Sequence, residues 1–159
     1  MNIRIIAVGK IKEKYLQEAI KEYSKRLSRY CNLEIIEVED EKAPENLSIK
    51  EEELIKAKEA ERIKSKIQPN SYIISLVIEG KNLSSEEFSE KVQKLMVDGI
   101  NDITYVIGGS LGLSEEVINQ SDFKLSFSKM TFPHQLMRII LLEQIYRGFR
   151  IMRGEPYHR

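Results

Sequence analysis

The residues best suited to chemistry gather in the last third of the chain, in three stretches. A glycine loop spans 108–112, the segment 127–132 reads Phe-Ser-Lys-Met-Thr-Phe, and the tail ends Glu-Pro-Tyr-His-Arg. The first two stretches each follow a short strand-like run, and open α/β sheets bind ligands outside the carboxyl ends of their strands. The tail places an aromatic ring, an imidazole and a guanidinium side by side, which suits contacts with a nucleobase and a phosphate. We therefore expect a ligand crevice formed by this part of the chain.

The glycine loop by itself leaves two interpretations open. Its glycines are spaced G-G-x-x-G, which departs from the dinucleotide-binding fingerprint, and it lacks the Gly-Lys-Ser/Thr ending of a phosphate loop. Adjacent glycines permit a close approach of the backbone to a ligand, but they also permit a tight turn before a helix that begins near Ser114. The pattern is compatible with a binding loop and with a turn.

Segment 127–132 has the same ambiguity. Ser128 and Thr131 are natural helix-capping residues and Pro133 fits a first helical turn, so the segment is readable as a capped helix start. Alternatively, its backbone groups hydrogen-bond a planar ring, whose faces pack against the aromatic and methionine side chains of the segment. His134, which follows, is expected to be a structural histidine with a satisfied hydrogen bond.

A long helix is predicted for 133–152, and its apolar residues face almost every direction around the helix axis. A helix that is apolar on all sides is buried on all sides, and a terminal helix of a chain this small is not easily wrapped by its own fold. A homodimer interface is the economical explanation. The arginines of this helix, Arg138, Arg147 and Arg150, then need partners, either Glu143 or a phosphate.

The segments that must position these residues alternate between strand and helix patterns. Apolar runs predict strands at 3–8, 33–38, 72–78, 105–107 and 123–127, and helical spacing predicts helices at 16–30, 48–67, 84–99, from about 114, and at 133–152. Residues 79–82 are expected to leave the third strand. Alternation of this kind means a parallel sheet with helices on both faces, and no linker divides the chain. We therefore predict a single α/β domain over residues 1–159.

The composition is that of an ordinary globular protein, with 42% hydrophobic and 31% charged residues and a formal net charge of zero. Zero net charge argues against a general nucleic-acid coat, although 124–159 holds two lysines and five arginines against two acids. The single cysteine, Cys31, excludes an intrachain disulfide and fits a reducing compartment. No apolar run is long enough to span a bilayer and no cluster suits a metal, so we expect a cytoplasmic protein without membrane or metal partners.

Taken together, these stretches resemble a known family. The residues that carry the resemblance are Tyr105-Val106-Ile107-Gly108-Gly109, Gly112-Leu113-Ser114, Leu125-Ser126, Thr131-Phe132-Pro133-His134, Arg138, Glu143-Gln144-Ile145-Tyr146-Arg147 and Pro156-Tyr157-His158-Arg159. This combination is similar to the ribosomal large-subunit pseudouridine methyltransferase H family, of the SPOUT class, and the similarity covers the whole chain. One position departs from the family: Val77 follows Leu76, where members often carry an aspartate.

The resemblance implies a SPOUT α/β fold whose C-terminal part is tied in a trefoil knot, a rarity among proteins. It also implies S-adenosylmethionine as the cofactor. Matched position by position, the cofactor contacts fall at Leu76, Gly108, Phe127, Ser128, Lys129, Met130, Thr131 and Phe132. The implied activity is that of a homodimer that methylates a ring nitrogen of a pseudouridine in 23S rRNA on the assembled ribosome.

For the tail, the residues and the resemblance together give a hypothesis. Tyr157 stacks on or positions the target base and His158 accepts its proton, in their own subunit or in the partner's. Contacts that hold RNA phosphates or order the tail are expected from Arg138, Arg147, Arg150 and Arg159. Two other classes of protein stay open: a non-catalytic ribosome- or RNA-binding assembly factor, and a small-molecule enzyme of the nucleotide-binding α/β type.

Overall fold

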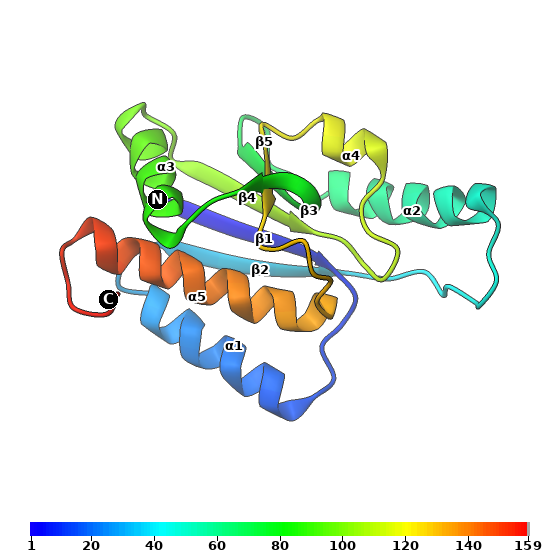
Figure 1. Ribbon diagram of the computed structural model, residues 1–159, viewed down its shortest axis with the longest axis horizontal. Helices are drawn as coiled ribbons and strands as arrows, with labels where there is room; N and C mark the ends of the chain where they lie inside the picture. The colour runs from blue at the N-terminus through cyan, green and yellow to red at the C-terminus, as the bar shows by residue number, and fades with distance from the viewer. Residues whose placement is uncertain (159) are drawn as a thin grey trace.

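A computed structural model describes residues 1–158 of the chain, so the predicted role of Arg159 lies outside the described residues. The strands are β1 (Asn2–Val8), β2 (Asn32–Val38), β3 (Tyr72–Asn82), β4 (Asp102–Ile107) and β5 (Phe123–Ser126). The helices are α1 (Lys14–Leu27), α2 (Ile49–Lys64), α3 (Ser85–Val97), α4 (Glu115–Asn119) and α5 (His134–Met152). The strands form one parallel sheet in the order β2-β1-β4-β3-β5 (Figure 1).

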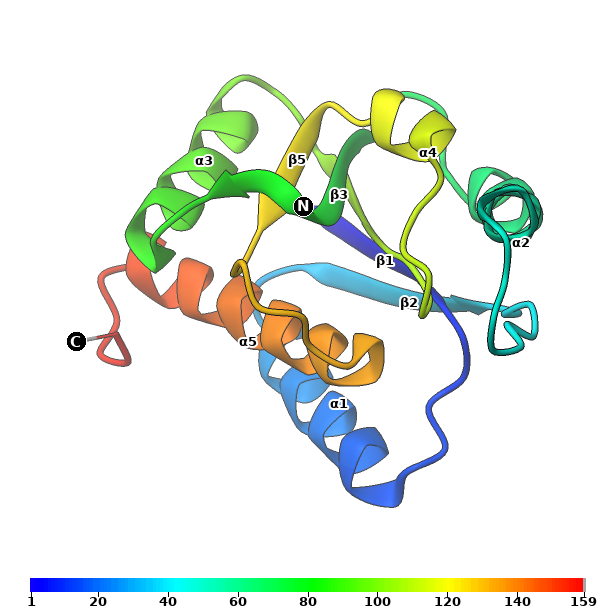
Figure 2. The same cartoon turned by 45° about the vertical axis from the view of Figure 1, so that its right-hand side comes forward.

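Helices cover both faces of this sheet, as the alternation of strand and helix patterns predicts. Helices α1, α3 and α5 lie on one face, and α2 and α4 lie on the other (Figure 1 and Figure 2). Successive residues of the strands supply the two cores: Ile5 and Tyr105 pack under α5, whereas Ile6 and Val106 pack under α2. This period of two follows from the pleat of a strand. The predicted fold class is therefore confirmed, and the trefoil knot stays a prediction.

The strand order explains why the helices divide between the two faces. The connections that contain α1 (β1 to β2) and α3 (β3 to β4) run toward the β2 edge of the sheet. The connections that contain α2 (β2 to β3) and α4 (β4 to β5) run toward the β5 edge. A crossover between parallel strands keeps one hand, so a reversal of direction requires a change of face. The end of β4 is therefore a topological switch point, because β4 leads to one face and its neighbours β1 and β3 lead to the other.

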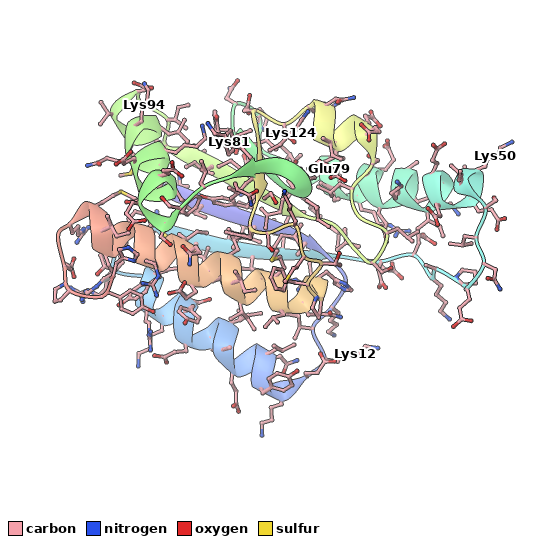
Figure 3. The ribbon with its side chains drawn as sticks, viewed as in Figure 1. Lys12, Lys50, Glu79, Lys81, Lys94 and Lys124 are labelled. Carbon is pink, nitrogen blue, oxygen red and sulfur yellow. The ribbon has the colours of Figure 1, made fainter. Side chains whose placement is uncertain are left out.

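Strand β3 is longer than the apolar run predicts, so the expectation that 79–82 leave the strand is wrong. After an irregular stretch that follows Leu76, β3 pairs again with β5 through Lys81 and Asn82. Gly80 makes this possible, since a Cβ there would lie 2.8 Å from the backbone of β5. Figure 3 shows the side chains of Glu79 and Lys81 projecting around this edge of the sheet.

Helix α5 is wrapped by its own chain more completely than the sequence argument assumed. Leu141, Leu142, Ile145 and Phe149 are at most 4% exposed and belong to the core beneath the sheet. Near the start of the helix, an apolar side chain on its outer side stays exposed: Leu136 is 38% exposed. The apolar excess of α5 therefore serves the fold of its own chain, and the homodimer stays a prediction.

A buried hydroxyl in the central strand gives a test of this core. Tyr105 is fully buried, and its hydroxyl has no hydrogen-bond partner among residues 1–158. We expect Tyr105→Phe to leave the free energy of unfolding unchanged or to raise it by up to about 1 kcal/mol, since an unsatisfied buried polar group destabilises. The measurement is denaturant-induced unfolding near neutral pH.

Tyr30→Phe is the matched control, because the Tyr30 hydroxyl lies 3.0 Å from Glu155 and 3.1 Å from Arg150. Loss of these bonds is expected to lower the free energy of unfolding by about 1 kcal/mol or more. If Tyr105→Phe destabilised the protein as much as Tyr30→Phe, the buried hydroxyl would have a partner, such as a trapped water molecule.

Candidate functional site

A cleft of about 720 Å³ opens at the C-terminal ends of β3, β4 and β5, where the strand order places the switch point. This volume lies within the range of small-molecule sites. Its walls come from the irregular stretch 76–79 of β3, the glycine loop after β4 and the loop between β5 and α5. The two loops that sequence analysis left ambiguous therefore face the same space.

Most of the residues expected to hold a cofactor line this cleft. They are Leu76, Gly108, Phe127, Ser128, Met130, Thr131 and Phe132. Lys129, the eighth expected contact, is exposed and does not line it. The tertiary structure thus brings together segments that are about 50 residues apart, from 76 to 132. Sequence reasoning missed Met137 and Glu79 in the walls; the helical spacing of Met137 from His134 was the available signal for the first.

The glycine loop is a tight turn that also forms a wall. Gly112 donates its backbone N–H to the carbonyl of Gly109 at 3.0 Å, and Gly112 has a φ of +84°. A Cβ on Gly108 would lie 2.7 Å from the carbonyl carbon of Gly112. Ser114 then caps α4 by accepting a hydrogen bond from the N–H of Val117. The interpretation as a tight turn before a helix is therefore confirmed, and the need for Gly108 comes from closing that turn. The loop also lines the cleft, so its role in binding stays a prediction.

The loop between β5 and α5 is held by side chains that bond inside it. The Ser128 hydroxyl accepts the N–H of Met130 at 3.0 Å, and Ser126 donates its hydroxyl to the Ser128 carbonyl at 3.1 Å. Helix α5 has Pro133 at its N-cap position without a side-chain cap, so the predicted capping by Ser128 or Thr131 is wrong. The backbone amide and carbonyl groups of Thr131 and Phe132, at the end of this loop, have no hydrogen-bond partner among residues 1–158.

His134 stands on the cleft wall at the first residue of α5. Neither of its ring nitrogens is hydrogen-bonded within the described part of the chain, so the expected structural hydrogen bond is absent. Burial and the nearby Arg138 guanidinium lower the pKa of His134, which keeps its ring neutral near pH 7. Gly9 lies beside the ring, and its φ of +94° favours glycine, although a Cβ there would make only an ordinary contact with Nε2 at 3.6 Å.

Arg138 is 1% exposed and ties the start of α5 to the ends of two strands. Its guanidinium donates to a Glu37 carboxylate oxygen at 2.6 Å and to the backbone carbonyls of Gly9 and Val8 at 2.6 and 3.1 Å. A guanidinium that is buried in this way is not accessible to RNA. The position of Arg138 therefore does not support its expected RNA contact, and its role is to fix the floor beside the cleft.

The tail folds back along the C-terminal half of α5. Arg150 pairs with Glu155 and donates to the carbonyl of Pro156 at 2.9 Å. Arg147 pairs with Glu143 at 2.6 Å, and its guanidinium carbon lies 4.6 Å from the centre of the Tyr157 ring. In the described chain these two arginines therefore order the tail, which is one of the two roles expected of them.

Both chemical groups of the tail are engaged in this conformation. The Tyr157 hydroxyl donates to Glu143 at 3.1 Å, and burial together with this carboxylate raises the pKa of Tyr157 to about 12. His158 Nδ1 lies 3.1 Å from Arg147 Nη1, which can only donate, and His158 Nε2 lies 2.6 Å from Glu86. Nδ1 is therefore the acceptor and Nε2 carries the proton, so His158 has no free lone pair here.

Tail and cleft are not brought together within one chain. The cleft includes Met137 and the tail packs on Arg147, which places about 15 Å of helix between them at 1.5 Å per residue.

Residues 1–158 contain no group of three or more metal-ligating side chains and no helix long and apolar enough to cross a membrane. Cys31 is half-buried, and burial raises the pKa of its thiol to about 11, so it is not a reactive thiol.

Comparison with known proteins identifies the family. Residues 1–158 match a family model described as predicted SPOUT methyltransferase. The chain is 62% identical to Ribosomal RNA large subunit methyltransferase H from Clostridioides difficile strain 630 and 61% identical to that from Clostridium kluyveri strain ATCC 8527, each over the full length of both chains.

Solved structures show the same fold at low identity. A structure described as a methylase family protein from Haemophilus influenzae Rd KW20 has a TM-score of 0.51 at 13% identity, over 96% of this chain and 66% of that one. Another, from Neisseria gonorrhoeae, has a TM-score of 0.52 at 11% identity, over 91% of this chain and 81% of that one. The chain therefore belongs to the SPOUT methyltransferases and, within them, to the family of the large-subunit ribosomal RNA methyltransferases H.

Proposed function

We propose that this protein is an S-adenosylmethionine-dependent methyltransferase that modifies a ring nitrogen of a pseudouridine in 23S rRNA on the assembled ribosome. The observation that carries the proposal is the convergence of three segments, 76–79, 108–113 and 125–134, on one cleft. Relatives at 61–62% identity are named as large-subunit rRNA methyltransferases, which supports rRNA as the substrate.

The cleft has the chemistry to hold S-adenosylmethionine. Its apolar side chains, including Leu76, Phe127 and Phe132, suit the faces of an adenine ring. The backbone amide and carbonyl groups of Thr131 and Phe132 have no partner within residues 1–158, so they are free to bond the edge of that ring. When bound, this cofactor supplies a methyl group that is activated for displacement. The chain's own task is alignment, which contributes on the order of 7–11 kcal/mol in well-oriented reactions.

We further propose a homodimer that packs through the outer side of α5. The exposed apolar side chains near the start of this helix are Leu136, at 38%, and Met130, at 73%. In a two-fold interface each patch meets the same patch of the partner. Two antiparallel copies of α5 would place the tail of one chain over the cleft of the other, which accounts for a tail that lies far from its own cleft.

In that arrangement Tyr157 and His158 contact the target base. A tyrosine whose pKa is about 12 stays protonated near neutral pH, so Tyr157 acts by stacking and by donating a hydrogen bond. Arg147 and Arg150, released from Glu143 and Glu155, hold phosphates, together with Arg159. The side chains of these pairs are 15–24% exposed, so a polyanion can reach the arginines and replace their carboxylate partners.

The function is tested by methyl transfer to assembled ribosomes from cells that lack this protein, with free 23S rRNA as the comparison. We expect labelled methyl incorporation into a pseudouridine of the ribosomes only. A chain without 157–159 should still bind the cofactor, because the tail lies outside the cleft, and should lose on the order of 10²–10⁴ in single-turnover rate. Cofactor binding without methyl transfer by the full-length chain would instead indicate the assembly-factor class.

The cofactor site is tested by changing the glycine turn. Gly108→Ala is expected to weaken S-adenosylmethionine binding by more than about tenfold in calorimetry, because a Cβ 2.7 Å from the backbone of Gly112 displaces a cleft wall. Gly99→Ala is the control, since it adds the strain of a positive φ, a Cβ there meets nothing within 4 Å, and Gly99 lies outside the cleft. Undiminished affinity in Gly108→Ala would place the cofactor elsewhere.

The dimer is tested by charge on the outer side of α5. Leu136→Glu is expected to shift the protein from dimer to monomer in sedimentation, because it buries a carboxylate in the proposed interface. Val97→Glu, at an 80% exposed position at the end of α3, should leave the dimer intact. Leu142 is unsuitable for this test because it is 0% exposed in its own chain. A wild-type protein that sediments as a monomer would refute the proposed interface.

A further inference from the structure

The site contains a histidine that neither the sequence pattern nor the family name assigns to chemistry. His134 lines the cleft, and both of its ring nitrogens are without a hydrogen-bond partner in residues 1–158. A half-buried imidazole normally finds at least one partner, because leaving a polar group unsatisfied has a cost. An unpartnered imidazole on a cleft wall is therefore available to a ligand.

The two histidines of the chain differ in what they can accept. In this conformation His158 receives the N–H of Arg147 on Nδ1 and directs its own N–H to Glu86, so it offers a lone pair only after the tail rearranges. His134 is neutral and keeps the lone pair of one nitrogen free. Of the two, His134 is the one that can take a proton without rearrangement.

The charges around His134 keep it in this state. Arg138, one turn further along α5, is the cation that lowers the pKa of His134, and its own charge is balanced by Glu37 at the end of β2. Asp40, after β2, raises the pKa of His134, but its effect is smaller than that of burial and of Arg138. The remaining charged groups of the cleft wall are Lys56 on α2, Glu79 on β3 and Glu115 on α4.

We propose that His134 accepts the proton of the target ring nitrogen during methyl transfer, while the tail positions the base. The proposal rests on the function proposed above. His134 takes the proton of the N–H bond, and the electron pair left on nitrogen forms the new N–CH₃ bond as the S–CH₃ bond of the donor breaks and leaves a neutral thioether. His134 then returns the proton to water, so no further reactant is needed.

The test compares His134→Gln and His134→Asn with His158→Gln in single-turnover methyl transfer to ribosomes, at saturating enzyme and cofactor, across pH. The wild-type rate should rise with pH through the pKa of His134 and then level off. The two His134 variants should bind the cofactor normally and lose on the order of 10²–10⁴ in rate near neutral pH. Their rates should keep rising with pH as the acceptor's own N–H ionises. His158→Gln should keep the wild-type shape of the pH profile.

A second readout does not depend on activity. In NMR titrations of the free protein, the His134 ring should titrate below the ordinary histidine range, and adding S-adenosylmethionine should perturb it more than the His158 ring. An active wild-type enzyme whose His134 variants stay within about threefold of its rate would overturn the inference, as would a His134 that is protonated at neutral pH. The inference would also be overturned if His158→Gln, and not the His134 variants, lost the levelling-off of the rate at high pH. A wild-type enzyme that transfers no methyl group would instead count against the proposed function itself.

Discussion

The buried guanidinium of Arg138 is the interaction on which the functional end of the molecule depends. It joins α5 to the ends of β1 and β2 through Glu37 and the carbonyls of Val8 and Gly9. A buried charge is costly to desolvate, and a carboxylate and two carbonyls offset that cost at its two terminal nitrogens, whereas Nε has no partner among residues 1–158. Because α5 begins one turn earlier, the same bonds fix the position of His134 and of the loop that precedes it.

The cleft depends on the sheet in a similar way. Strand β4 leads to the opposite face from its neighbours, so the segments that leave the strands diverge and open a space at their C-terminal ends. Two small residues keep that space in shape: Gly108 lets the turn after β4 close on itself, and Gly80 lets β3 continue beside β5. The walls are therefore parts of the sheet architecture, which is the rigid support that precise alignment of two reactants requires.

The tail is held by a different kind of force. Two ion pairs join arginines of α5 to Glu143 and Glu155, whose side chains are 19% and 24% exposed, and a third joins His158 to the exposed Glu86. Solvent reaches all three pairs and weakens them, which it cannot do at Arg138. Arg147 contacts Glu143, Tyr157 and His158 at once, so a competing anion at Arg147 would loosen all three contacts together. A strongly held helix start and a weakly held tail suit an enzyme that must keep its cleft fixed and adapt its outer contacts to a large substrate.

The sequence by itself determined the alternation of strands and helices and the two-faced parallel sheet, because hydrophobic period and turn chemistry are local properties of the chain. The family followed separately, from the resemblance of its residue motifs. It also singled out the loops that meet in the cleft, since glycine and serine after an apolar strand indicate a strand end. Only the tertiary structure decided what the polar residues of α5 do. Arg138 is buried and His134 lacks a partner, because each outcome depends on which distant segment packs against that turn of the helix. Arg147 differs, since its partner Glu143 lies four residues earlier on the same helix and could be expected from the spacing. Spacing along one helix carries no information about a distant segment, so the roles of Arg138 and His134 were not readable from the chain alone.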